Sequence, residues 1–472
     1  MKHIYSSIVF IALFLTACSQ HPTLDDFFIE DEIILDAEDL LNDDPNKGVE
    51  IEKDNTGSIV ASANPPELIT AEQMRPHQVV TLPGDAAQKK ESKKKEKAAT
   101  AKKKQKKIFV PFQSRLKDLT FINEASSKPV FDPNALGDHL LGKPVGDATT
   151  VSPEVDAYRQ SIMEMKLSYE DRNLSKMRKW RDQELITVPR QHETLFYPFS
   201  GPDVVNMLTF FPNQQTYVMM GMEYVGTIDT VADWMKPLTQ SRMDTIRKAV
   251  ESVFIRSFFR TLDMSSDFSR NGTRGVLPGM LLMLKLMDRN IKSVQWVALN
   301  EDGSLRYLTA EETKVNCDNF GVQVTIAHPT QGYDQTIYYF KTDLTNKPMA
   351  ENKGLRSFIT KRLGTTMTFV KSASFLMHMK EFIWMRDAVL DISRCVLQDD
   401  SGVPFKFYIP SKWRYSLFGE YVGPYGESFA AFKQPELNKA YDSQPLQLLE
   451  FNFGYGYAKI PSHLMLFKRI EN

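Results

Sequence analysis

The pattern of apolar and polar positions divides the chain into a polar first quarter and a longer part in which structured segments recur. From about Phe109 onward, short apolar runs that suit strands alternate with segments whose apolar residues return every three or four positions, as in helices. Strands that alternate with helices are typical of α/β proteins. The sequence therefore predicts one large α/β domain, a mixed sheet flanked by helices, with strands at 194–197, 216–224, 293–299, 322–327, 336–341, 366–370, 448–453 and 464–468.

The predicted helices are recognised by their first residues or by their apolar face. Ser152 can cap a helix that Pro153 and Glu154 begin and that runs to about Leu185. The segment 276–287 is apolar nearly all round, which is typical of a buried helix. Further helices are predicted at 202–210, 241–254, 355–363 and 375–392, and a hairpin at 395–409 whose turn is Asp399-Asp400-Ser401-Gly402.

The first residues have the pattern of a secretory signal peptide. Lys2 precedes an apolar run, Ile8 through Leu15, that is too short to span a bilayer as a permanent helix. The ending Leu15-Thr16-Ala17-Cys18 resembles a bacterial lipobox, in which the cysteine is lipidated and becomes the first mature residue. Residues 1–17 are therefore predicted to be removed and Cys18 to anchor the protein in the bacterial cell envelope. The alternative is a non-lipidated signal or a chance cysteine.

Residues 18–107 are predicted to form a disordered tether rather than part of the core. Its first half mixes many acids with a few apolar residues, and its second half, Lys89–Lys107, is a lysine block. The block acts either as a solvated spacer or as a contact for an anionic envelope polymer or lipid headgroups. Because it lacks interleaved aromatic residues and the whole chain has a net charge of −1, specific nucleic-acid binding is not expected. The globular domain is predicted at 108–472, and Ser19 after the cysteine favours the outer membrane over the inner one.

Five segments of the globular part carry a resemblance to other sequences. They are Phe196-Tyr197-Pro198-Phe199-Ser200-Gly201-Pro202-Asp203, Phe211-Pro212-Asn213, Gly221-Met222-Glu223-Tyr224-Val225-Gly226, Ser372-Ala373-Ser374-Phe375-Leu376-Met377-His378 and Gln398-Asp399-Asp400-Ser401-Gly402-Val403-Pro404. Through these segments, residues 190–472 resemble a family of uncharacterised exported bacterial proteins. The resemblance implies no particular activity, cofactor or ligand.

Two serines are candidates for a catalytic role. Ser200 lies in a predicted strand–turn–helix, where open α/β sheets place ligands, and Asp203 begins the helix. The alternative, which we favour, is that Ser200 only caps this helix. Ser374 and His378 are four positions apart, so that on a helix they share a face and could act as nucleophile and base. The alternative is an ordinary hydrogen-bonded histidine, and His463 is a further weak candidate.

Acidic residues beside turns are candidates for a metal site. If Glu223, Asp399 and Asp400 cluster in space, their oxygens suit Mg²⁺ or Ca²⁺, but acids in a turn more often bond their own backbone. No zinc, P-loop or dinucleotide motif is present in the sequence, so no cofactor is expected. Cys317 and Cys395 could pair in an exported protein or remain buried thiols.

The sequence leaves two classes of function open. The first, which we favour, is a lipid-anchored binding or envelope-organising protein. The alternative is a tethered α/β hydrolase-like enzyme with a serine- or carboxylate-centred site. A ligand site of either kind is expected where the turns after two parallel strands, at Ser200 and at Ser372–Ser374, meet on one edge of the sheet.

Overall fold

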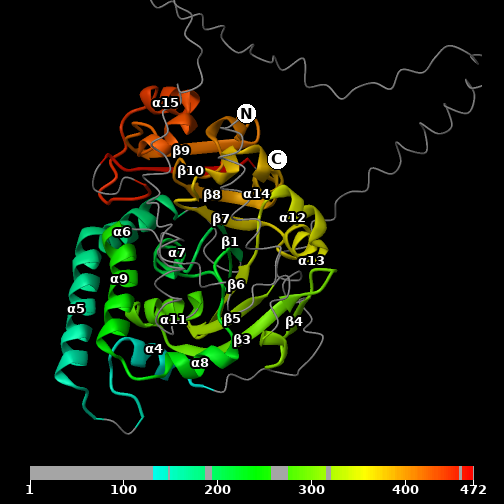
Figure 1. The fold of residues 1–472 in the computed structure, drawn as a ribbon. Helices are drawn as coiled ribbons and strands as arrows, with labels where there is room; N and C mark the ends of the chain where they lie inside the picture. The colour runs from blue at the N-terminus through cyan, green and yellow to red at the C-terminus, as the bar shows by residue number, and fades with distance from the viewer. Residues whose placement is uncertain are drawn as a thin grey trace, which may run out of the picture. The chain divides into compact units, whose positions relative to one another are not determined.

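Ten strands make up one mixed sheet among the residues that the structure, a computed structural model, describes (131–146, 149–186, 194–256, 275–314, 320–455 and 460–470). From edge to edge the order is β4-β3-β5-β6-β2-β1-β7-β8-β10-β9 (Figure 1). The strands are β1 Thr194–Pro198, β2 Thr216–Gly221, β3 Ile291–Leu299, β4 Leu305–Tyr307, β5 Gly321–Ala327, β6 Asp334–Lys341, β7 Thr366–Val370, β8 Ser393–Gln398, β9 Trp413–Gly419 and β10 His463–Arg469.

The middle of the sheet is parallel and its two sides are antiparallel. Strands β6, β2, β1, β7 and β8 all run in the same direction, whereas β5 and β10 pair antiparallel with the outer members of this group. Every residue of β1 and β7 is buried. Strands covered on both faces have near-continuous apolar sequences, and this pattern is why the sequence predicted the neighbouring strand β2, which is buried after Thr216. The α/β fold with a mixed sheet is thus confirmed.

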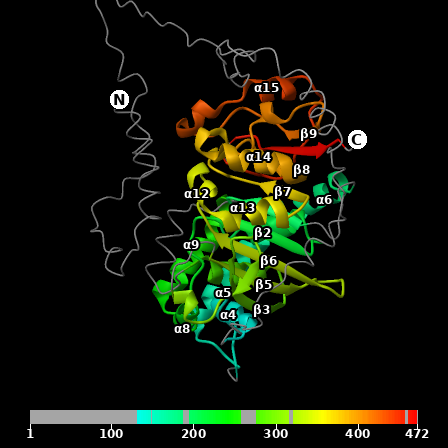
Figure 2. The same cartoon turned by 90° about the vertical axis from the view of Figure 1, so that its right-hand side faces the viewer.

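Helices cover both faces of the sheet. Because successive side chains of a strand point to opposite faces, Leu195 and Tyr197 belong to one apolar core and Phe196 to the other. The first core is closed by helices on the left of Figure 1, and Figure 2 shows α12, α13 and α14 in front of the strands on the other face. The first group is α4 Pro133–Leu140, α5 Pro153–Tyr169, α6 Ser175–Glu184, α7 Val204–Phe210, α8 Ile228–Trp234, α9 Gln240–Arg256 and α11 Val276–Leu286; the second is α12 Asn346–Glu351, α13 Lys353–Ser357, α14 Ile383–Ile392 and α15 Pro435–Asp442.

Several predicted helices form as their sequences indicate. The hydroxyl of Ser152 caps α5 by accepting a hydrogen bond from the backbone N–H of Val155, and Pro153 is the first helical residue. A π-helical turn, Glu170–Leu174, joins α5 to α6, so the predicted long helix is nearly continuous. Helix α11 is buried along almost its whole length, as its apolar sequence predicted. None of the described helices is long and apolar enough to cross a membrane.

Three local predictions are wrong. Residues 375–392 do not form one helix: two short 3₁₀ turns, Leu376–His378 and Lys380–Phe382, precede α14. Strand β8 forms no hairpin with 405–409, because its partners are β7 and the distant β10, and Phe405–Phe407 is a 3₁₀ turn. Residues 448–453 form no strand; the edge position belongs to β9, whose half-exposed sequence gave no strand signal.

Several predictions fall outside the described residues. These are the signal peptide at 1–17, Cys18, the tether with its Lys89–Lys107 block, the start of the globular domain at 108, and Cys317. Cys395 lies buried on β8.

Candidate functional site

Charged and polar side chains gather at the carboxyl ends of β1, β7 and β8, together with the start of β10. The strands β1 and β7 are adjacent and parallel, so the turns that follow them leave the sheet at the same edge. Strand β10 is antiparallel to β8 and begins at this edge with His463. Crevices at the carboxyl ends of parallel strands are the usual ligand sites of open α/β sheets. We call this edge, with its residues described below, the carboxyl-edge cluster.

A buried ion pair joins the turns after β1 and β7. Lys371 follows β7 directly, and its Nζ lies 2.8 Å from Oδ2 of Asp203. The two side chains are only 1% and 4% exposed, so neither charge is solvated by water. Asp203 also accepts hydrogen bonds from the Tyr197 hydroxyl and from the backbone N–H of Asn206, where it caps α7. Burial and the Asp203 charge raise the pKa of Tyr197, which keeps this phenol a donor.

Asp399 ties the turn after β7 to the turn after β8. Its Oδ2 accepts the backbone N–H of Ser372 at 2.8 Å, and its Oδ1 accepts the backbone N–H and the hydroxyl of Ser401. The Ser401 hydroxyl oxygen in turn accepts the backbone N–H of Ala373 at 2.7 Å. Burial, and then the neighbouring charge of Asp400, raise the pKa of Asp399. The two turns are therefore held in one fixed arrangement by a single carboxyl group.

Asp400 and His463 form the second acidic contact of the cluster. Nε2 of His463 lies 3.1 Å from Oδ1 of Asp400 and 3.2 Å from its backbone nitrogen. Burial disfavours the imidazolium, but the charges of Asp400 and Asp399 outweigh it and raise the pKa of His463. Among the described residues, three polar atoms here are shielded from solvent and have no hydrogen-bond partner: Oδ2 of Asp400, Nδ1 of His463 and Oγ of Ser372.

Aromatic rings cover the turn after β7. The Tyr455 hydroxyl donates to the carbonyl of Ser372 at 2.8 Å and accepts the backbone N–H of Ser374 at 3.0 Å. The Phe375 ring stacks on Phe432, with centroids 5.2 Å apart. Nε2 of His378 lies 3.1 Å from the carbonyl oxygen of Asp400. Burial lowers the pKa of His378 to about 4, so this imidazole is neutral at pH 7 and donates to that carbonyl.

The backbone of these turns adopts uncommon conformations. Phe199, Ser372, Ser374 and Phe375 have φ values of 58°, 51°, 51° and 54°. Residues with side chains avoid this left-handed region because Cβ meets the backbone there. Such conformations persist only where surrounding contacts enforce them, and they concentrate at functional sites. At Ser372 and Ser374 these contacts are the hydrogen bonds from their backbone N–H groups to Asp399 and to Tyr455.

The two predicted catalytic serines lie at this edge, but neither meets a histidine. The Ser200 hydroxyl donates to the carbonyl of Met220 at 3.3 Å, and the cap of α7 is Asp203, not Ser200 as we favoured. The Ser374 hydroxyl lies 3.0 Å from that of Tyr455. His378 is not one helical turn from Ser374, because Phe375 breaks the predicted helix with its positive φ.

The predicted metal ligands do not come together. Glu223, after β2, accepts a hydrogen bond from the Tyr339 hydroxyl of β6 at 2.9 Å, whereas Asp399 and Asp400 bond within the carboxyl-edge cluster. In the described part of the chain, no group of three histidine, cysteine or acidic residues is placed to hold a metal ion. The alternative, that an acid in this turn bonds nearby backbone, is confirmed for Asp399, whose carboxylate accepts the backbone N–H of Ser401.

Sequence reasoning missed Lys371 and Ser401. The sequence did hold a signal for Lys371. This lysine directly follows the predicted strand 366–370, so its charge is held close to the core. Ser401 lay inside a predicted turn, and nothing in its sequence context separated it from ordinary turn residues. His463, only a weak candidate in the sequence, proves to be nine-tenths buried beside Asp400.

The chain matches no protein-family model, no curated protein and no solved structure. The resemblance to exported bacterial proteins therefore stays a prediction. Four of the five segments on which it rests nevertheless include the carboxyl ends of β1, β2 and β8 or the turn after β7, and so lie at the carboxyl edge. The remaining segment, Phe211-Pro212-Asn213, precedes β2 and lies at the opposite edge.

Proposed function

We propose that this chain is a lipid-anchored protein of the bacterial cell envelope whose folded domain binds a ligand or partner, with residues 18–107 as its tether. The anchor rests on the signal peptide and on the cysteine at position 18. Two acyl chains on one cysteine would hold the protein stably at a membrane. The carboxyl-edge cluster is the part of the domain best suited to a specific role, because it concentrates buried charge and backbone strain.

One observation favours binding over serine catalysis. A serine nucleophile needs a base within hydrogen-bond reach of its hydroxyl. Ser200 instead donates to a backbone carbonyl, and Ser374 is bonded to the phenol of Tyr455. The proposed serine–histidine pair of a hydrolase is therefore not formed by these residues.

The anchor is tested by replacing the proposed lipidated residue. Cells that express the wild type or Cys18→Ser are grown with labelled fatty acid, and the protein is recovered from membrane and soluble fractions. Only the wild type should carry label and remain with the membranes, because serine lacks the thiol that the lipid modifies. If Cys18→Ser is labelled to the same extent, the anchor proposal is wrong.

A second candidate function, acid–base catalysis, is favoured by the three unpartnered atoms of the cluster. A buried polar atom without a partner is costly, and native proteins keep few of them. Asp400 holds one nitrogen of His463, which leaves Nδ1 of that imidazole to take or give a proton. The Ser372 hydroxyl is also unpartnered, and Ser372 is itself one of the residues with a positive φ, so its hydroxyl is the candidate partner in such a proton transfer.

A hydrolase assay separates the two candidates. The purified full chain is tested with chromogenic esters, amides and phosphate esters, alongside His463→Gln and, as a matched histidine control at the opposite edge, His328→Gln. Binding without chemistry predicts no turnover by any of the three proteins. Turnover that His463→Gln lowers by about a hundredfold or more, with His328→Gln unaffected, would establish the catalytic candidate and overturn the binding one.

A further inference from the structure

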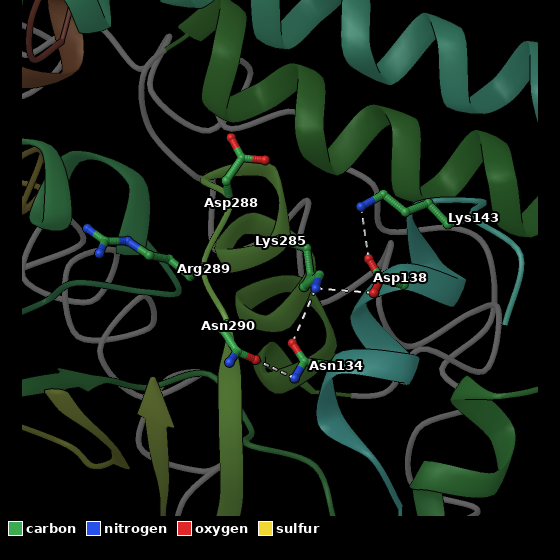
Figure 3. A pocket seen from close by; sticks show the side chains of 7 residues that line it. All are labelled: Asn134, Asp138, Lys143, Lys285, Asp288, Arg289 and Asn290. Carbon is green, nitrogen blue, oxygen red and sulfur yellow. Dashed lines mark hydrogen bonds and ion pairs between the residues drawn. The ribbon is translucent and has the colours of Figure 1, made fainter. Parts of the chain in front are cut away.

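A polar hollow of about 410 Å³ lies at the amino edge of the parallel strands, away from the carboxyl-edge cluster. It is formed by α4, by the loop that follows this helix, and by the end of α11 with the turn that leads into β3 (Figure 3). Its lining residues are Asn134, Asp138, Lys143, Lys285, Asp288, Arg289 and Asn290. Three of these seven are cations and two are acids, so the hollow has an excess of positive charge.

Both acids of the hollow are already paired with lysines. Asp138 lies 3.0 Å from Nζ of Lys143 and 3.1 Å from Nζ of Lys285. Asp288 lies 3.0 Å from Nζ of Lys166, on α5. Figure 3 shows that the guanidinium of Arg289 extends to the side away from the Lys285–Asp138–Lys143 chain. Neither acid therefore neutralises Arg289.

Arg289 is buried without the partners that other buried arginines have. It is 7% exposed, and within the described residues it forms no ion pair and its Nη1 has no hydrogen-bond partner. Arg242 is equally buried, but its guanidinium donates to the carbonyls of Trp234 and Lys236. Arg386 lies beside Asp387 and over the Phe407 ring.

The other groups around Arg289 carry no negative charge. Its charge acts on the phenols of Tyr217 and Tyr333, which are neutral at pH 7. His328 accepts the backbone N–H groups of Thr330 and Gln331 at Nδ1. Burial and the Arg289 charge lower the pKa of His328, so this imidazole is neutral as well. Among the described residues, the positive charge of Arg289 is therefore not compensated by an ion pair.

We propose that Arg289 binds an anion, namely the phosphate or carboxylate group of a small ligand that occupies the hollow. A buried cation without a counter-charge is destabilising, and an external anion removes this cost. The planar guanidinium offers paired N–H donors that match the oxygens of such groups. Lys285 and Lys143 share the single carboxylate of Asp138, so together they leave one net positive charge at the same hollow, on the side away from the Arg289 guanidinium. The proposal does not depend on the carboxyl-edge cluster or on the membrane anchor.

The test follows the melting temperature of the purified full chain as inorganic phosphate or acetate is added at constant ionic strength, set with sodium chloride. The wild type should show a saturable rise of about 3 °C with at least one of the two anions. Arg289→Met should melt no lower than the wild type without the anion and should show no saturable rise. Arg356→Met, the same charge change at an exposed position on α13, should respond like the wild type.

A second variant keeps the arginine and gives it an internal carboxylate. His328→Asp can still accept the two backbone N–H groups, and its charge should replace the external anion, so the saturable rise should again be lost. The phosphate and acetate arms distinguish a phosphorylated from a carboxylated ligand. The proposal is overturned if the wild type shows no saturable rise with either anion, or if Arg289→Met and His328→Asp respond as the wild type does.

Discussion

Replacement of Lys371 by methionine is expected to lower the free energy of unfolding by about 3–5 kcal/mol. The variant removes one member of an ion pair whose side chains are 1% and 4% exposed. Asp203 would then remain charged and buried, with only the hydrogen bonds from Tyr197 and Asn206 to support it. An uncompensated buried charge costs far more than the loss of a contact at the surface.

Urea denaturation of the full chain measures this loss of stability. Two further variants test whether the loss comes from leaving a buried charge without its partner. In Lys371→Met/Asp203→Asn, the amide can still cap α7 but carries no charge, so most of the lost stability should return. Lys292→Met breaks an exposed pair with Asp334, 47% and 44% exposed, and should cost no more than about 1 kcal/mol. Equal losses for Lys371→Met and Lys292→Met would show that the buried pair does not carry the expected energy.

The stability of the folded domain should also depend on pH through His378. Burial lowers its pKa from 6.5 to about 4, which corresponds to about 3 kcal/mol between the two protonation states. The pKa of His378 is lower in the folded state than in the unfolded state. The stability that the neutral imidazole contributes is therefore fully present above pH 6.5. It is lost as the pH falls toward 4, where the unfolded chain binds the proton and the folded chain does not. His378→Gln should therefore lose less stability than the wild type across this window.

The measurement is a set of urea titrations of both proteins at several pH values from 7 to 4. The raised pKa values of Asp399 and His463 act in the opposite sense, so that they favour the folded state as the pH falls. Both groups are present in both proteins, and their effects largely cancel in the difference. A wild type and a His378→Gln protein with the same pH profile would contradict the assignment of this dependence to His378.

The centre of the sheet was predictable because its strands are covered on both faces. In β2 every position after Thr216 is buried, and its sequence is accordingly a run of mostly apolar residues with turn residues behind it. Helix α11 was predictable for the same reason. At the edges of the sheet this signal fails: β9 exposes Arg414 and Tyr415, and its strand conformation depends on its pairing with β10.

The candidate site was predictable in its location but not in its chemistry. The turns that carry Ser200 and Ser374 do follow adjacent parallel strands, as their positions after apolar runs indicated. The contacts within the cluster did not follow from local pattern. The predicted helix after Ser374 failed because the hydrogen bonds of Asp399 and Tyr455, made with residues distant in the chain, hold Ser372 and Ser374 at positive φ.

The sequence by itself determined which segments become central strands and buried helices, and which turns lie beside them, because burial leaves an apolar period in the chain. The tertiary structure alone decided that Lys371 meets Asp203 and that Asp400 meets His463. It also decided that Arg289 is buried and that, among the described residues, its Nη1 has no hydrogen-bond partner. Each of these contacts joins elements far apart in sequence, and the order of strands in the sheet, which no local pattern encodes, sets which of them are neighbours.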